Sequence, residues 1–577
     1  LIQELLKQLG VADLKADNVV THDLGDGRSA FWAMRDDLLI TGTCRAELDR
    51  LLELQKNAGR DSLGQSAEFR YMLAQLPERS VTRMYAYFPD AFIRRQVGPA
   101  VKIAQLRRAA AQVKLEQITG AALLARLDGL PPPDSVQALA ASRHLPAAGA
   151  AAYDGYALGT NGVASSPAWG TLARLKTLAE TALDNVTPAE ANAYKAYVDN
   201  YSRYWRRYFD PIAIRLDDAP GDAIEATTFI LPLVDNTAYN GLREVLLTRE
   251  DGAELRAPGL APEPVVMMSL NLRDESWRKI AEGLSEVFMR YGGVSPAILD
   301  DFGPGLHLAI HDGDPVIALG SGDMLGALNA NLLGAGGGQG GGMMFIPVAL
   351  SVLTRPCSLI VETRNPDRTR QYLRQTTGSR SPTMRGRGMD VDFSQVEGQD
   401  SWVCSLDAMG LLKLRYGIEV QGSYVVVRNI PWSNKDRVAR TDTAPLTGAC
   451  LQAYPAACAQ QLPGLFAAAQ DRSLTSAMQN LGLLYPLVAS GCATPETAAA
   501  ELARLFGYKP VHPGDGKWGW ENFELTSTLY GSVRRQRQPA YAKEKTDFGL
   551  FHDIAHLCVG MQFEDTGLRT LVRWKPR

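Results

Sequence analysis

Apolar and polar side chains alternate near the start of the chain in a pattern typical of short strands. Residues Val19–Gly42 follow this alternation, and the dipeptides Asp26-Gly27 and Asp36-Asp37 supply turns. The spacing then becomes helical over Cys44–Gln55 and alternates again over Val81–Phe88. We therefore predict an antiparallel meander, a helix and a further strand in the first 150 residues.

A long helical region is expected from Trp169 to about Phe209. Its second half starts with Thr187-Pro188-Ala189-Glu190, which has the pattern of a capping box with proline in the first turn. Five tyrosines follow at steps of three and four residues, so they share one stripe of the helix. They are Tyr194, Tyr197, Tyr201, Tyr204 and Tyr208.

Tyrosine keeps a hydroxyl group that needs a hydrogen-bond partner when the ring is buried. Five in register therefore suit a half-buried seam, either inside the molecule or against another chain. We favour the internal seam and keep the partner surface as the alternative.

The middle of the chain repeats the mixture of strand and helix patterns. Strand patterns occur at 265–272 and 358–363, each followed by a helical pattern, and hairpins are expected at 305–320 and 411–432. The last hairpin has the same order of strand, polar turn and apolar strand as the hairpin at 31–42. This favours an internal duplication whose first copy is cut short at the N-terminus; two unrelated hairpins are the alternative.

The late part of the chain predicts a helical insert, Leu446 to about Tyr530. It includes the helix start "TPE" at 494–496, a stop at Gly507 and an aromatic hairpin carrying Trp518 and Trp520. We divide the chain into five parts: a first α+β half at 1–150, a helical segment with the tyrosine stripe at 151–245, and a second α+β half at 246–440. The helical insert with the aromatic hairpin follows at 441–535, and a C-terminal helix and hairpin that complete a sheet lie at 536–577.

Composition narrows the range of functions. The 577 residues favour two to four domains, and a hydrophobic content of 46% allows each to bury a core. A formal charge of -3 gives no general attraction to nucleic acid, and no apolar run reaches the length of a membrane span. Because the chain begins at Leu1, we expect either a chain processed at its N-terminus or a fragment, and the loss of a signal peptide or lipid anchor is compatible with both.

Histidines supply the candidate metal ligands. His552, Asp553 and His556 resemble the central motif of HD-type phosphohydrolases, in which divalent metals activate water. The segment lacks the helical bundle and the further ligands which that chemistry needs, and a short structural helix explains it better. His307 and His311 lie four residues apart, on one face of a predicted strand, but no third ligand can be named. We predict no cofactor.

Seven cysteines include no CxxC pair, which excludes zinc-ribbon and thioredoxin motifs. Cys450, Cys458 and Cys492 lie in one region of the sequence and are compatible with a disulfide in an oxidising compartment. The alternative is that these three are small buried apolar residues.

Several segments resemble a family of uncharacterised bacterial envelope proteins, classed as a domain of unknown function. The likeness rests on "DDLLITGTCRAELDRLLELQ", "DSLGQSAEFRYMLAQLPE" and "RMYAYF" early in the chain. It continues in "ILDDFGPGLHLAI", "SLIVETRNPDRTRQYLRQ" and "FEDTGLRTLVRW". The resemblance implies an exported α+β protein with repeated halves, often tethered by its N-terminus, and it offers no catalytic residues.

These observations predict an α+β protein with two related sheet-and-helix halves and antiparallel sheets. A long helical segment lies between the halves, and a helical insert comes late. We expect a non-catalytic structural or assembly protein of the periplasm or cell exterior, acting through a protein partner or self-assembly. One alternative is a metal-dependent hydrolase that uses the segment 552–556, with His307 or His311 brought near. The other is a protein that binds glycans or lipids through its aromatic hairpin.

Overall fold

The chain has an α+β fold in which antiparallel sheets are combined with helices. The computed structural model describes residues 19–25, 28–35, 38–57, 59–60, 62–145, 150–181, 183–204, 210–232, 237–252, 254–280, 282, 296–313, 355–378, 389–408, 412–429, 437–543 and 553–577.

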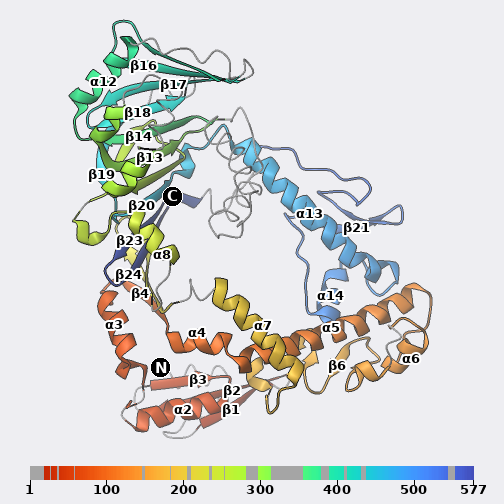
Figure 1. Cartoon of the computed structure of the whole chain (residues 1–577). Coiled ribbons are helices and arrows are strands. Elements are labelled where there is room, and N and C mark those ends of the chain that lie inside the picture. The colour runs from red at the N-terminus through yellow and green to blue at the C-terminus, as the bar shows by residue number, and fades with distance from the viewer. Residues whose placement is uncertain are drawn as a thin grey trace.

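A 13-stranded antiparallel sheet, the large sheet, forms the centre of the fold (Figure 1). From one edge its strands are β15 (Met389–Gln395), β16 (Ser401–Ala408), β17 (Leu412–Gln421), β18 (Tyr424–Asn429), β14 (Cys357–Thr363), β13 (Phe302–Ile310), β12 (Val266–Asn271), β20 (Ala449–Ala453), β23 (Ile554–Glu564), β24 (Gly567–Pro576), β10 (Ala223–Ile230), β9 (Ile212–Ala219) and β4 (Thr82–Phe88).

Two parts of this sheet have the same order of elements. The chain forms β4, makes a long excursion and returns as the hairpin β9–β10; it later forms β20, makes a second excursion and returns as the hairpin β23–β24. The two hairpins meet where β10 pairs with β24. Outward from that pair, the order of strands is therefore β24, β23, β20 on one side and β10, β9, β4 on the other, which in both cases is a hairpin followed by a single strand.

Each excursion forms an arm that leaves the large sheet. The first arm contains α4 (Asp90–Val97), α5 (Pro99–Leu127), α6 (Val136–Ala141), α7 (Pro188–Tyr204) and a small sheet of β5 (Ala157–Leu158), β6 (Ala164–Ser166), β7 (Gly170–Thr171) and β8 (Arg174–Leu175). The second contains α13 (Leu462–Ala489), α14 (Ala498–Phe506) and the hairpin β21 (Trp518–Glu521)–β22 (Glu524–Ser527). At ~1.5 Å per residue, α5 and α13 are both about 40 Å long.

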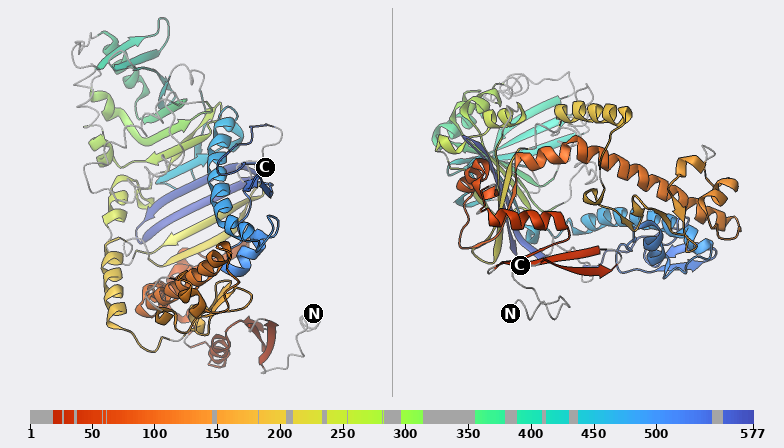
Figure 2. Two further views of the ribbon diagram at one scale, coloured as in Figure 1. Left: turned by 90° about the vertical axis from the view of Figure 1, so that its right-hand side faces the viewer. Right: turned by 90° about the horizontal axis from the view of Figure 1, so that it is seen from below.

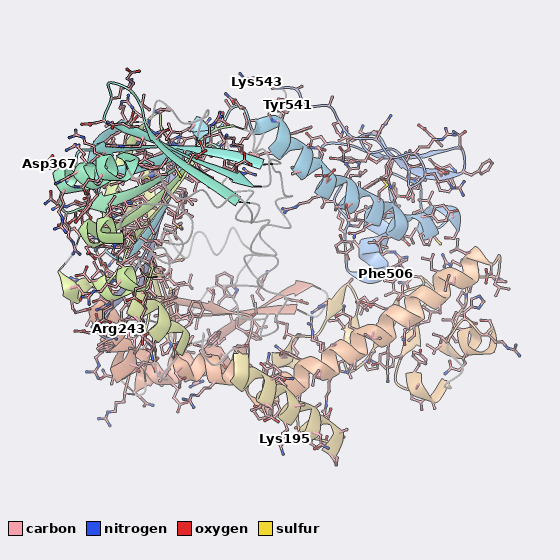
Figure 3. All side chains as sticks on the ribbon, turned by 45° about the horizontal axis from the view of Figure 1, so that its top comes forward. Lys195, Arg243, Asp367, Phe506, Tyr541 and Lys543 are labelled. Atoms are coloured by element: carbon pink, nitrogen blue, oxygen red, sulfur yellow. The ribbon has the colours of Figure 1, made fainter. Side chains whose placement is uncertain are left out.

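The two arms meet at their far ends, away from the large sheet (Figures 1 and 2). Leu123 of α5 belongs to one apolar core with Leu484 of α13 and Leu505 of α14. Phe506, labelled in Figure 3, packs against this core and also against the core of the first arm. Arg504 adds a hydrogen bond of 3.0 Å to the carbonyl oxygen of Asn161. We call this contact the arm joint.

Both faces of the large sheet carry covering elements. On one face, α3 (Ala67–Gln75) packs on β9 and β10, and the ribbon of β11 (Arg256–Ala261) and β19 (Arg437–Thr443) covers β12, β13, β14 and β18. On the other face, α8 (Thr237–Val245) is followed by Leu246, which packs together with Trp277 on the central strands β12, β13, β14, β20 and β23. Farther along the same face, α12 (Pro366–Gly378) packs on β15–β17.

Several predicted elements are confirmed. The meander is β1 (Val19–Gly25), β2 (Arg28–Arg35) and β3 (Leu38–Gly42), and α2 (Arg45–Lys56) follows it. The hairpin at 411–432 is β17–β18, and Gly507 ends α14 with a φ of 70°. The second strand of the hairpin expected at 305–320 lies outside the described residues. The two similar hairpins lie in different sheets, β2–β3 in the small N-terminal sheet and β17–β18 in the large one.

Other predictions are wrong in part. The helix expected from Trp169 is only α7, because residues 170–175 form β7 and β8. The range 151–245, predicted to be helical, also supplies β9 and β10, which alternate buried and half-buried residues as sheet strands do. β20 belongs to the large sheet rather than to the insert, and the C-terminal segment from Ile554 is a strand and not a helix.

Candidate binding surfaces

One face of the large sheet is apolar along a continuous row. Residues directly opposite one another in antiparallel strands point to the same face, so the pairing register identifies the members of a row. From Met268 the register leads to Leu308 on one side and to Leu451 on the other. The complete apolar row from β14 to β4 is Leu359, Leu308, Met268, Leu451, Val559, Val572, Ala226, Leu216 and Met84.

The neighbouring row on the same face is apolar too. It runs from β14 to β10 through Cys357, Ile310, Val266, Ala453, Leu557, Trp574 and Ile224. Together these two rows define what we call the apolar face. At ~4.8 Å between strands, the apolar row extends for about 40 Å.

The apolar face is incompletely covered. Met268 and Leu359 are each 40% exposed, Leu451 is 41% exposed, and Met84 at the edge strand is 50% exposed. The cluster around Trp277 and the helix α12 cover the face on two sides of these residues. An apolar row that combines exposed and half-buried residues is typical of a site of interaction, because leaving apolar surface in water is unfavourable.

The opposite face holds a charged pocket of about 470 Å³. It lies between the end of α3, the residues before β20 and the central strands β9, β10, β23 and β24. Its lining includes Glu225, Gln562 and the guanidinium groups of Arg79, Arg215, Arg249, Arg569 and Arg573. We call it the arginine pocket.

Carboxylates balance part of the charge of the arginine pocket. Arg215 lies 2.7 Å from Asp217, Arg573 lies 2.9 Å from Glu225, and Arg569 lies 2.7 Å from Glu564. Burial works to raise the pKa of Glu564, but hydrogen bonds from Arg569 and Gln562 outweigh it, so the pKa lies below its usual range. Five guanidinium groups against three carboxylates leave the pocket with a positive potential.

The histidines of the predicted metal motif do not form a described metal site. His552 lies outside the described residues, and Asp553 is exposed just before β23. His556 is half-buried in the strand, with its ring centroid 4.7 Å from that of Tyr454. Burial and the positive charges of Arg573 and Lys575 lower the pKa of His556. Nearby positive charges also disfavour a metal cation at this position.

The second histidine pair stands apart from the first. β12 and β20 lie between β13, which carries His307, and β23, which carries His556. His307 is fully buried, neither ring nitrogen has a hydrogen-bond partner in the described structure, and burial lowers its pKa to about 4. His311 lies beyond the end of β13, with Nε2 at 3.4 Å from Ser358 Oγ. Within the described residues, no three His, Cys, Asp or Glu side chains are placed to hold a metal ion.

The first two tyrosines of the stripe face the inside of the first arm. Tyr194 donates a hydrogen bond of 3.1 Å to the carbonyl oxygen of Val97, and the Nζ atom of Lys102 lies 5.1 Å from the centre of the Tyr197 ring. The capping box at Thr187 and Glu190 forms, and Arg107 of α5 also binds Glu190. The side chains of Tyr201 and Tyr204, and the whole of Tyr208, lie outside the described residues, so a partner surface there stays a prediction.

The three cysteines predicted to cluster are not brought together. Cys450 lies in β20, whereas Cys492 follows the far end of α13, where Arg126 donates a hydrogen bond of 3.1 Å to its sulfur. No disulfide bond joins any of the seven cysteines, all of which lie among the described residues. The sulfur atom of Cys450 instead lies 3.4 Å from the sulfur atom of Cys558.

The aromatic hairpin packs against its own arm. The ring of Trp518 lies 4.3 Å from that of His512, and Trp520 is stacked on Tyr485 of α13 at 5.8 Å. The described ring contacts of both tryptophans are therefore with aromatic residues outside the hairpin. Phe523, at the turn, is 87% exposed.

Sequence reasoning did not find the apolar face or the arginine pocket. Alternation marked several of the strands, but the order of strands in the sheet decides which residues become neighbours. Arg569 and Arg573 stand four residues apart in "LRTLVRW", which was a signal that both share one face of a strand. Nothing in the sequence indicated that Arg79 and Arg249 join them.

Comparison with protein-family models, with curated proteins and with solved structures yields no match in any of the three. Among the described helices, none combines the length and the apolar character needed to cross a membrane.

Proposed function

We propose that this chain is a non-catalytic binding protein that holds an apolar segment of a protein partner against the apolar face of its large sheet. The observation that carries the proposal is the exposure of Met268, Leu359 and Leu451 within one apolar row, in which Met268 and Leu451 are direct neighbours and the half-buried Leu308 separates Met268 from Leu359. Their burial by a partner would gain roughly 25 cal/mol for each Å² removed from water.

The shape of the apolar face favours a protein segment over a small lipid. Sites for small ligands are concave and enclose most of the ligand surface. The apolar row instead extends across nine of the thirteen strands, about 40 Å at the usual strand spacing. An amphipathic helix of roughly 25 residues, about 10 Å wide, has these dimensions, and laying its apolar stripe along such a surface is a known mode of recognition.

The observations that would favour the two alternatives are weaker. The described histidines lie on separate strands, so the hydrolase has no described set of ligands. In the aromatic hairpin, both tryptophan rings are engaged by Tyr485 and His512 of the same arm. The likeness to bacterial envelope proteins supports an exported location, and we include this location in the proposal.

The test measures binding of a defined peptide. A labelled amphipathic helix of about 25 leucine and glutamine residues is titrated with the full chain, and binding is followed by fluorescence anisotropy. We expect the double variant Met268→Gln and Leu451→Gln to weaken binding by at least tenfold. Glutamine removes the apolar contact without adding charge, and both positions are exposed enough to accept it.

The matched control is Leu106→Gln with Val113→Gln, two exposed apolar residues on α5 at 49% and 50% exposure. The control should bind the peptide like the unaltered chain. Parallel titrations use phosphatidylcholine vesicles and a fatty acid. Tight binding of lipid but not peptide would replace this proposal by the lipid alternative, and equal loss in both variants would remove the apolar face from consideration.

A further inference from the structure

Two cysteines, distant in sequence, meet at the base of the second arm. Cys450 lies in β20 and Cys558 in β23, 108 positions later, and their sulfur atoms are 3.4 Å apart. Both side chains are buried, beneath Leu255 and Ala444. We infer that Cys450 and Cys558 form a disulfide bond when the protein matures in an oxidising compartment.

The sheet geometry favours the bond. Cys450 is directly opposite Gly560, and Cys558 is directly opposite Gln452, so the two cysteines are diagonal neighbours on one face. Because Gly560 has no side chain, the side chain of Cys450 can turn toward Cys558. Closing the gap to the ~2.05 Å of a disulfide needs an approach of roughly 1.4 Å. Diagonal neighbours have Cα atoms about 7–8 Å apart, at the upper limit of what a disulfide spans, so the bond needs a small shift of the two strands toward each other as well as side-chain rotation.

The chemistry needs an external disulfide as the oxidant, and glutathione disulfide is sufficient. The Cys558 thiolate attacks one sulfur of this molecule, which releases one glutathione thiolate and leaves a mixed disulfide. Cys450 then loses its proton to solvent and attacks the Cys558 sulfur, which releases the second glutathione. Two thiols of the chain are oxidised, and one glutathione disulfide is reduced to two thiols.

The local electrostatics supports Cys558 as the attacking sulfur. Contact with Cys450 lowers the pKa of Cys558, and the nearby guanidinium group of Arg573 acts in the same direction. Arg573 is the residue directly opposite Cys558 in β24. The pKa of Cys450 is raised by the same contact and by burial.

The bond would fasten the arm where it leaves the sheet. The whole second arm, from α13 to the hairpin β21–β22, lies between Cys450 and Cys558 in sequence. Its far end is already held at the arm joint by the core around Leu484 and Leu505. A bond at the base therefore restrains the second arm at both of its ends and limits the freedom of the unfolded chain.

The experiment compares full chain exported to a bacterial periplasm with the same chain incubated with dithiothreitol. Free thiols are blocked at low pH, and peptides are mapped by mass spectrometry without reduction. We expect a peptide pair joining Cys450 to Cys558 in the exported protein. Its melting temperature should exceed that of the reduced protein by roughly 5 °C or more.

Variants separate the bond from other effects of the cysteines. In Cys558→Ser the difference between oxidised and reduced samples should vanish, whereas Cys492→Ser should keep it. Because each variant is compared with itself, a general loss of stability does not imitate the result. Blocked Cys450 and Cys558 in the exported protein, or a bond from either to Cys458, would overturn the inference. Neither outcome bears on peptide binding at the apolar face.

Discussion

Burial, rather than residue type, sets the properties of the most informative single residues. His307 is fully buried on β13 with both ring nitrogens unpartnered, whereas His556 is half-buried beside Tyr454. Buried polar groups without partners cost stability, and charging them costs more. The spacing of His307 and His311 predicted that the two share one face of a strand, but spacing does not show how deeply a side chain is buried. The structure makes His307 a neutral residue of the core.

Acid should therefore destabilise the protein through His307. Its pKa of about 4 lies below the unfolded value of 6.5, so the folded state binds fewer protons. The contribution is fully present above pH 6.5 and is lost as the pH falls from 6.5 toward 4, by on the order of 3 kcal/mol. Urea unfolding across this range should give a shallower loss of stability for His307→Gln than for the unaltered chain. Equal pH profiles would contradict the prediction. His556→Gln should change the profile less than His307→Gln, because His556, whose pKa is also lowered, is only half-buried.

At the scale of elements, local signals located some helix ends and missed others: the start predicted at 494–496 is wrong, because α14 begins at Ala498. The capping box at Thr187 and Glu190 forms as expected, and Gly507 adopts the left-handed conformation at the end of α14. The C-terminal segment shows the limit of such signals. Phe551, Ile554, Ala555 and Cys558 fit a helical stripe, but pairing with β20 and β24 makes the segment from Ile554 a strand. Tertiary pairing overrides a short ambiguous pattern.

Two glycines allow two contributions to the free energy of unfolding to be measured separately. One is the strain of a side chain in the left-handed conformation, and the other is the loss of a contact between the arms. Gly491 and Gly507 have φ angles of 68° and 70°, and a side chain at Gly491 would meet nothing within 4 Å. At Gly507 a Cβ atom would lie 2.3 Å from the carbonyl oxygen of Leu172, in the first arm. We expect Gly491→Ala to cost about 1 kcal/mol and Gly507→Ala to cost ~3 kcal/mol or more. Denaturant unfolding measures both, and similar losses would argue against close contact of the arms.

At the scale of the whole molecule, the two arms and the large sheet form a closed path (Figure 1). Each arm starts in the sheet, and the arms join through residues more than 300 positions apart in sequence, as Arg126 and Cys492 show. Helices of similar length, α5 and α13, span the distance. Because the arm joint buries an apolar core shared by both arms, we expect it to control the motion of both arms.

Adjacent leucines on α13 test this expectation. Leu484 is fully buried in the arm joint, while Leu483 is 47% exposed. Leu484→Asp places a charge in an apolar core and should open the joint, which would speed hydrogen exchange of α5 around Leu123. Leu483→Asp should leave that exchange unchanged. Unaltered exchange of α5 in Leu484→Asp would show that the arms do not stabilise each other.

The sequence by itself determined the fold class, the meander, several of the other strands and one end each of α7 and α14. These depend on periodicity and capping, which are properties of neighbouring residues. The tertiary structure alone decided that β9, β10 and β20 join one sheet and that Leu359, Met268 and Leu451 align in one row. It also brought Cys450 to Cys558 and Arg79 to Arg569. The reason is physical: strand order and burial depend on contacts between distant segments, and no local pattern encodes which strands become neighbours.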